Sequence, residues 1–247
     1  MDFVILVLAG LGAGALNAVA GGGTFLSFPA LVFVGVPHIP ANATATLAAL
    51  PGYIGSTWGF RKDISRDGPV SLRAMIALSV LGGLMGALLL LVTPKEIFVS
   101  LVPWLLLFAT VAFAAGPLLV RHVVGKGGRL PLPASLALLL AVSIYGGYFN
   151  GGLGIMLLAA FGFVGFTNLH EMNGLKNLLS SILSLVSVIT YTVAGLIDWK
   201  SALVLGVACA IGGYLGALVA RRITNMHALR VFITLVGLGM AAAFFAQ

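Results

Sequence analysis

Long apolar runs fill most of this chain, and short clusters of Pro, Gly and charged residues separate them. Ten runs occur, at residues 3–20, 24–36, 42–60, 70–92, 97–120, 132–149, 155–166, 173–197, 202–220 and 228–246. Eight have about 18 residues or more, which at 1.5 Å per helical residue approaches the roughly 30 Å hydrocarbon core of a bilayer. Lipid offers no partner to an unpaired backbone N–H or C=O, so the pattern predicts an all-α polytopic membrane protein.

The second and seventh runs, residues 24–36 and 155–166, are the exceptions, because they are too short to cross a bilayer alone. A glycine-rich stretch precedes each of them, at residues 21–24 and 151–154. The equal spacing of these stretches indicates an internal repeat.

A second match supports the repeat: GGLMGAL at residues 82–88 returns as GGYLGAL at residues 212–218. The sequence therefore predicts two five-segment halves, residues 1–124 and 125–247, with a short broken helix in each. Within the match, the glycines four residues apart favour close helix packing: Gly82, Gly86, Gly212 and Gly216.

Positive charge indicates how the halves are oriented. If every run crosses the membrane, eleven basic side chains lie on one side: Arg61, Lys62, Arg66, Arg73, Arg121, Lys126, Arg129, Lys176, Arg221, Arg222 and Arg230. Only Lys95 and Lys200 lie on the other. Basic residues are enriched on the cytoplasmic side, so both termini are expected outside and the halves are expected to be inverted. If the short runs re-enter without crossing, the halves are parallel instead.

Composition excludes several classes of protein. With 60% hydrophobic and 8% charged residues and a mean hydropathy of +1.15, the chain is too apolar for a soluble domain. The 13 Lys and Arg are dispersed, which argues against nucleic-acid binding. A single cysteine, Cys209, provides no disulfide framework. The chain has no metal-ligand spacing, nucleotide-binding loop or enzyme motif, so we expect neither a metal nor a cofactor, and no enzyme activity.

The two glycine-rich stretches are the main candidate site. A helix that begins inside the membrane has up to four unpaired N–H groups and about half a positive charge at its start. Glycines let this backbone approach a ligand closely. We therefore predict that two helix N-termini face one small anion, with a simple tight turn as the alternative. The residues concerned are Gly21, Gly22, Gly23, Thr24, Gly151, Gly152 and Gly154.

Polar side chains at the starts of the third and eighth runs extend this site: Asn42, Thr46, Asn173, Lys176 and Asn177. Asn42 and Asn173 are also expected to be helix N-caps, and Thr46 could simply bond back to its own helix. A lysine at the centre of a bilayer costs roughly 2.5–3.5 kcal/mol unless it is paired, so a buried Lys176 would imply an anionic partner. Its alternative is snorkelling to the headgroups.

Four further residues have open roles. Asn17 and Asn150 directly precede the glycine stretches and could either bind an oxyanion or tie helices together. Glu171 could carry a coupling proton, pair with Lys176, or be a solvated loop residue. Tyr53 is among the aromatic residues near segment ends, for which an interfacial belt is expected.

Several motifs resemble one known family. Residues 20–31 read AGGGTFLSFPAL, residues 35–37 read GVP and residues 42–46 read NATAT. Together they resemble the glycine-rich signature of the sulfite exporter TauE/SafE family of membrane permeases, and VAGLIDW at residues 193–199 resembles its second-half ending. The resemblance implies transport, often outward, of sulfur-containing oxyanions such as sulfite, sulfoacetate, thiosulfate or other organosulfonates.

The residues and the resemblance together predict a secondary anion transporter of the cell membrane, working by alternating access as an exporter. Its expected partners are a small anion, membrane lipid, and a coupling ion, either proton or sodium. The alternatives are a passive anion channel, a transporter of small carboxylates, and a non-transporting membrane scaffold. The sequence leaves the oligomeric state open.

Overall fold

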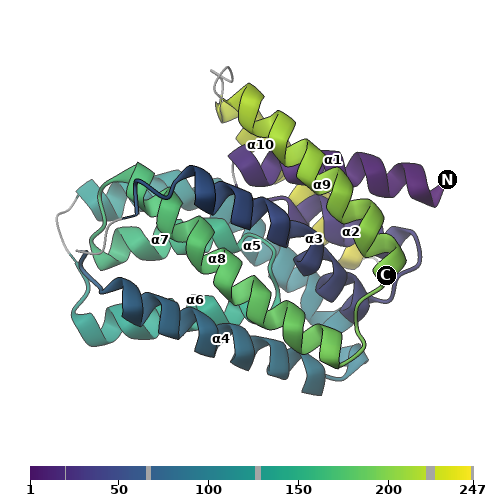
Figure 1. Cartoon of the computed structure of the whole chain (residues 1–247), viewed down its shortest axis with the longest axis horizontal. Helices are drawn as coiled ribbons and strands as arrows, with labels where there is room; N and C mark the ends of the chain where they lie inside the picture. The colour runs from purple at the N-terminus through teal and green to yellow at the C-terminus, as the bar shows by residue number, and fades with distance from the viewer. Residues whose placement is uncertain (20, 65–67, 126–128, 221–225, 246–247) are drawn as a thin grey trace.

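The computed structural model describes residues 1–19, 21–64, 68–125, 129–220 and 226–245, which form ten α-helices and no strand (Figure 1). The helices are α1 (Asp2–Val19), α2 (Thr24–Phe33), α3 (His38–Gly59), α4 (Leu72–Val92), α5 (Lys95–Gly125), α6 (Leu132–Tyr148), α7 (Leu153–Val164), α8 (Leu169–Val193), α9 (Trp199–Ala220) and α10 (Met226–Phe245). Each coincides with one predicted run, which confirms the all-α prediction. The short members are α2, with 10 residues, and α7, with 12.

Four helical segments of the described chain are long and apolar enough to cross a membrane: Leu72–Val92, Lys95–Ala112, His170–Val193 and Trp199–Gly216. This is fewer than the eight runs expected from run length alone. One reason is α3, which is 22 residues long but carries buried Asn42, Thr44 and Thr46 along its length. Further described helices, including α2 and α7, are apolar but shorter. Together with the four long helices they give the fold of a polytopic membrane protein.

Glycine determines the closest helix contacts. A Cβ added to Gly82 would lie 2.9 Å from the backbone N of Ile144, and one added to Gly86 would lie 2.6 Å from that of Tyr148, so α4 touches α6 backbone to backbone. Similarly, a Cβ on Gly212 or Gly216 would lie 2.7 Å or 2.6 Å from a Cα of α1. The prediction of close packing at these four glycines is confirmed.

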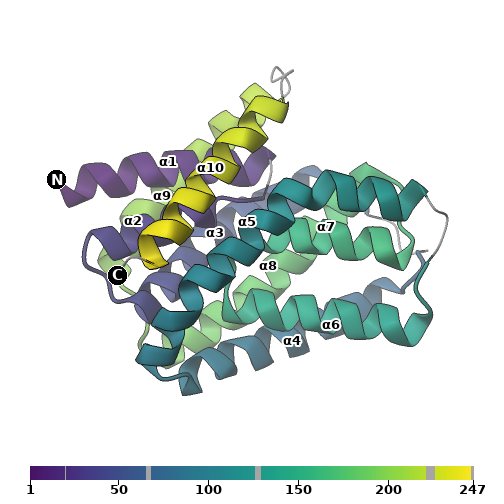
Figure 2. The same cartoon turned by 180° about the vertical axis from the view of Figure 1, so that it is seen from behind.

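Most helix contacts recur between the two five-helix sets, α1–α5 and α6–α10. The α1–α9 contact has its counterpart in α6–α4, the α4–α8 contact in α9–α3, and the α1–α2 contact in α6–α7. Two contacts, α3–α8 and α5–α10, join equivalent helices of the two sets. In each set the short helix folds back beside the helix that precedes it (Figures 1 and 2).

Both chain termini lie at the same end of the helix bundle (Figures 1 and 2). The start of α3 lies there too, since the His38 ring is 5.7 Å from that of Phe244 near the end of α10. At the opposite end, a Cβ on Gly174 of α8 would lie 3.4 Å from the carbonyl oxygen of Phe60, which follows α3.

Described basic residues follow this polarity. At the end away from the termini, Arg61 and Lys62 follow α3, Arg73 lies in the first turn of α4, and Arg129 lies three residues before α6. Lys95 and Lys200 lie in the first turns of α5 and α9. The remaining residues of the charge prediction are only partly covered. Arg66, Lys126, Arg221 and Arg222 lie outside the described residues, as do the side chains of Arg121 and Arg230.

Candidate functional site

The break between α1 and α2 is a tight glycine turn fixed by an asparagine. Gly21 has φ +76°, a left-handed conformation that side chains disfavour, and its N–H donates to the Leu16 carbonyl at 3.0 Å. Asn17 Oδ1 accepts the N–H of Gly23 at 2.8 Å. Of the two roles considered for Asn17, the structure shows the one that ties the turn together.

The break between α6 and α7 has a similar form but different partners. Gly152, with φ +73°, precedes the first residue of α7 and lies against Ala109 of α5, where an added Cβ would be 2.9 Å from the alanine Cβ. The carbonyl of Gly151 accepts the Tyr145 hydroxyl at 2.7 Å. A larger residue would therefore not fit at Gly152.

The two breaks meet inside the bundle. A Cβ added to Gly21 would lie 3.5 Å from the Gly154 Cα, and one added to Gly154 would lie 3.4 Å from the Gly21 Cα. The ammonium nitrogen of Lys176 lies 3.8 Å from the same Cβ position on Gly21. Three residues far apart in the chain thus form one buried contact.

Unpaired backbone donors surround this contact. At α2 the N–H groups of Gly22 and Thr24 have no acceptor among the described residues, and at α7 the same holds for Gly151, Gly152 and Gly154. All five residues are buried. A buried, unpaired N–H is costly and rare, and its placement at a helix N-terminus favours an anion.

Lys176 adds a full charge to these partial ones. It is 5% exposed, and its Nζ donates to Asn173 Oδ1 at 3.1 Å, so the snorkelling alternative is wrong. The described carboxylates, Glu171 included, form no ion pair with it. The ammonium instead lies near the glycine contact. Asn173 can accept from it because residues three apart lie on the same face of a helix.

The other predicted side chains bond mainly to backbone carbonyls or lie within helices. Asn42 donates to the Tyr148 carbonyl at 2.8 Å, and its Oδ1 is buried without a partner among the described residues. Thr46 bonds back to the Asn42 carbonyl at 2.8 Å. Asn177 is buried, and its carbonyl accepts the Ser181 hydroxyl.

The prediction that Asn42 and Asn173 are N-caps is wrong, because both lie inside their helices. Pro37 precedes the first residue of α3. In α8 the N-cap is Asn168, whose side chain accepts the N–H groups of His170 and Glu171. The prediction took the first polar residue of each apolar run as the N-cap, and this residue lies five positions after the observed N-cap in both helices.

A buried hydrogen-bond chain beside the site was not predicted. The Tyr53 hydroxyl of α3 donates to Asn150 Oδ1 at 3.0 Å, and Asn150 Nδ2 donates to the Ser184 hydroxyl of α8 at 2.9 Å. Asn150 thus ties helices together, and Tyr53 is 2% exposed instead of interfacial. The spacing of Ser180, Ser184 and Ser187, three or four residues apart on α8, was the available sequence signal.

Comparison with known proteins gives a family. The model of the sulfite exporter TauE/SafE family matches residues 6–244. The chain belongs to this family. Its relatives include a Haemophilus influenzae "probable membrane transporter protein", 30% identical over 221 residues, which cover 86% of this chain and 83% of that protein.

Two further relatives of this TauE/SafE chain are similar in extent. The "probable membrane transporter protein ORF9" of a Sinorhizobium species is 28% identical over 226 residues, which cover 88% of the chain and 81% of the relative. The "probable membrane transporter protein YfcA" of Escherichia coli is 27% identical over 246 residues, with coverages of 96% and 87%. These matches place the chain among membrane transporters, which are not an enzyme class.

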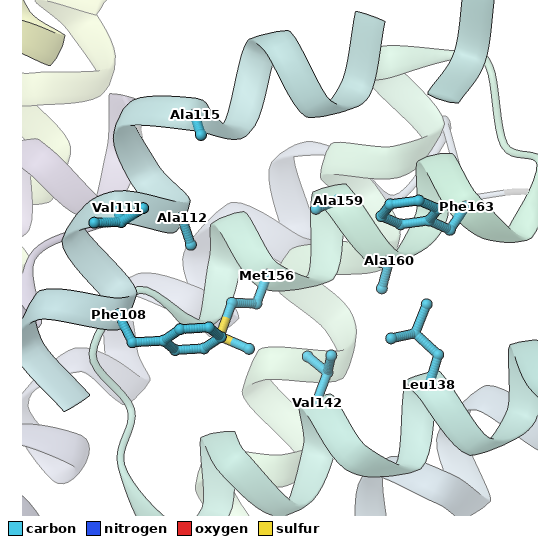
Figure 3. Close-up of a pocket in the computed structure, with 10 residues that line it drawn as sticks. All are labelled: Phe108, Val111, Ala112, Ala115, Leu138, Val142, Met156, Ala159, Ala160 and Phe163. Carbon is cyan, nitrogen blue, oxygen red and sulfur yellow. The ribbon is translucent and has the colours of Figure 1, made fainter. Parts of the chain in front are cut away.

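A separate cavity in the TauE/SafE chain lies between α5, α6 and α7 (Figure 3). Its volume is about 270 Å³, and the ten residues that line it are all apolar, including Phe108, Met156 and Phe163. An anion would find no hydrogen-bond donor among these side chains. The breaks at Gly21 and Gly154 therefore remain the candidate anion site.

Proposed function

We propose that this chain is a secondary transporter that exports small sulfur-containing oxyanions, such as sulfite, sulfoacetate or other organosulfonates. The anion is held by the N-termini of α2 and α7 and by Lys176. The observation that carries the proposal is the convergence of Gly21, Gly154 and the Lys176 ammonium at a buried point. Two partial charges and one full charge of the same sign meet there, with unpaired donors.

The sulfur chemistry of the substrate follows from family membership. Oxyanions suit the site because several oxygens can accept from different N–H groups at once. Charge-assisted hydrogen bonds of this type are roughly twice as strong as neutral ones. A site whose donors face no carboxylate among the described residues discriminates against cations.

Alternating access between two inverted halves is the mechanism we propose. The repeated helix contacts support two related sets. The termini share one end of the bundle whereas α6, which begins the second set, starts at the opposite end, and this fits inverted sets with an odd number of segments each (Figures 1 and 2). The basic residues at the opposite end then face the cytoplasm, and both termini lie outside. Inverted repeats with discontinuous helices are typical of secondary transporters, whose substrates bind between the repeats.

A thermal-shift panel on the purified protein tests the site. Sulfite, methanesulfonate, sulfoacetate, acetate and chloride are compared at equal ionic strength, and a sulfur oxyanion present at 100 times its Kd should stabilise the protein by about 2.7 kcal/mol. Stabilisation by acetate alone would favour a carboxylate transporter. If no anion stabilises the protein, the anion site is wrong.

Counterflow in proteoliposomes tests the transport mode. Vesicles loaded with unlabelled methanesulfonate should transiently accumulate the labelled anion above its external concentration, because a carrier exchanges one molecule for another. A passive channel equilibrates the label without overshoot. A scaffold protein gives no flux above that of empty vesicles.

A further inference from the structure

In the part of the chain that the structure describes, acidic residues lie only at the ends of helices or between them. The chain has six: Asp2, Asp63, Asp67, Glu96, Glu171 and Asp198. Asp2, Glu96 and Glu171 lie in the first turns of their helices, Asp63 follows α3, and Asp198 precedes α9; Asp67 is outside the described residues. No described carboxylate is therefore placed in a helix interior, where a coupling proton or sodium ion is commonly bound.

The helices that pack against α8 offer Lys176 no counter-charge. Among the described residues, α3, α4, α6 and α7 carry charged side chains only at or beyond their ends, where Arg73 is exposed. Their titratable interior groups are tyrosines, which are neutral and mostly hydrogen-bonded: Tyr53 to Asn150, Tyr145 to Gly151, with Tyr148 nearby on α6. On α8 itself, His170 and Glu171 lie in the first turn, and Tyr191 donates to Gly147.

From this arrangement we infer that Lys176 carries the proton that couples transport, an inference that rests on the proposed function. The ammonium form holds the anion. When the anion leaves, the side chain releases one proton to the same side and becomes a neutral amine. One anion and one proton thus move together in each cycle, and for a monoanion the loaded and empty sites both have no net charge. Export through such a symporter proceeds when the outward anion gradient exceeds the inward proton gradient.

The physical reason is the cost of an isolated buried charge. A buried ion that lacks a partner is neutralised either by a counter-ion or by a change of protonation. The transported anion is the counter-ion in the loaded state. In the empty state no described carboxylate can replace it, and the Asn173 amide oxygen that contacts Nζ carries only a partial charge. The remaining way to remove the buried charge is for the Lys176 ammonium to lose a proton.

Arginine at this position separates charge from proton transfer. A guanidinium keeps its proton at every working pH, whereas a lysine can lose it. A Lys176→Arg protein should therefore lose the link to the pH gradient to a greater extent than it loses anion exchange. Lys176→Gln should lose anion binding, because the full charge is gone.

The test uses methanesulfonate, which stays a monoanion throughout the working range, so that its own protonation cannot mimic coupling. Proteoliposomes contain equal potassium on both sides and valinomycin, which holds the voltage at zero. A gradient of one pH unit, acid outside, should drive about tenfold accumulation by the wild type, since one proton accompanies each anion. Lys176→Arg should lose this accumulation to a greater extent than it loses counterflow.

A calorimetric measurement keeps the inference testable if the arginine variant does not fold. Binding of methanesulfonate to the wild type, measured at alkaline pH in two buffers of different ionisation enthalpy, should take up as much as one proton per anion. Counterflow with neither proton uptake nor pH-driven accumulation would overturn the role of Lys176 and leave the proposed function intact. Absence of counterflow would overturn both.

Discussion

Replacing Gly21 with alanine tests the site at a position where a matched control exists. Gly21 and Gly195 have nearly the same left-handed backbone, with φ +76° and +70°. An added Cβ at Gly195 meets nothing within 4 Å, whereas at Gly21 it lies 3.8 Å from the Lys176 ammonium. The left-handed penalty, about 1–2 kcal/mol, is common to both variants. Their free energies of unfolding should therefore fall by similar amounts.

Anion binding should separate the two variants. The new methyl group at Gly21 occupies the side of Nζ that faces the glycine contact, so an anion loses at least one charge-assisted contact. That loss is about 1.5–3 kcal/mol, or roughly tenfold to 150-fold in Kd. At a fixed anion concentration, thermal-shift analysis should show at least about 1.4 kcal/mol less stabilisation of Gly21→Ala than of Gly195→Ala. Equal stabilisation of both would refute a site at this turn.

Three other substitutions probe the supporting structure. Tyr53→Phe leaves Asn150 Oδ1 unpaired and should cost about 1–3 kcal/mol in thermal unfolding, with a larger loss of counterflow than Thr57→Val causes. Asn168→Ala removes the N-cap of α8 and should cost about 0.5–2 kcal/mol without changing the Kd for the anion; a weaker Kd would mean that the start of α8 belongs to the site. Gly86→Ala should destabilise the α4–α6 contact by at least about 1 kcal/mol, whereas Gly55→Ala, which meets nothing within 4 Å, should be tolerated.

Backbone features of this fold could be predicted from the sequence because glycine and apolar length report on them directly. Consecutive glycines are unfavourable in a helix interior, so Gly21 to Gly23 had to end one helix and start another. The short runs behind the glycines then became α2 and α7. The packing role of Gly86 followed from its four-residue spacing within an uninterrupted helix.

Side-chain roles were harder to predict, because a polar residue in a membrane helix can bond to its own helix, to a neighbour or to a ligand. Thr46 uses the first option, Asn42 the second, and Lys176 is directed toward the glycine contact. The choice depends on which helix lies opposite, which one sequence does not specify. Tyr53 illustrates this: its position near a segment end suggested an interface, but it is buried and bonded to Asn150.

Side chains of each proposed half contact the helix break of the other. Asn42 and Tyr53 of α3 bond to Tyr148 and Asn150 at the second break, while Lys176 of α8 lies against the first break. A displacement of one half against the other must therefore change both breaks together. The two turns lie close to each other at Gly21 and Gly154. Under the proposed alternating access, an anion drives the turns apart only if it binds the separated form more tightly, because a ligand shifts a conformational equilibrium only through its difference in affinity for the two states.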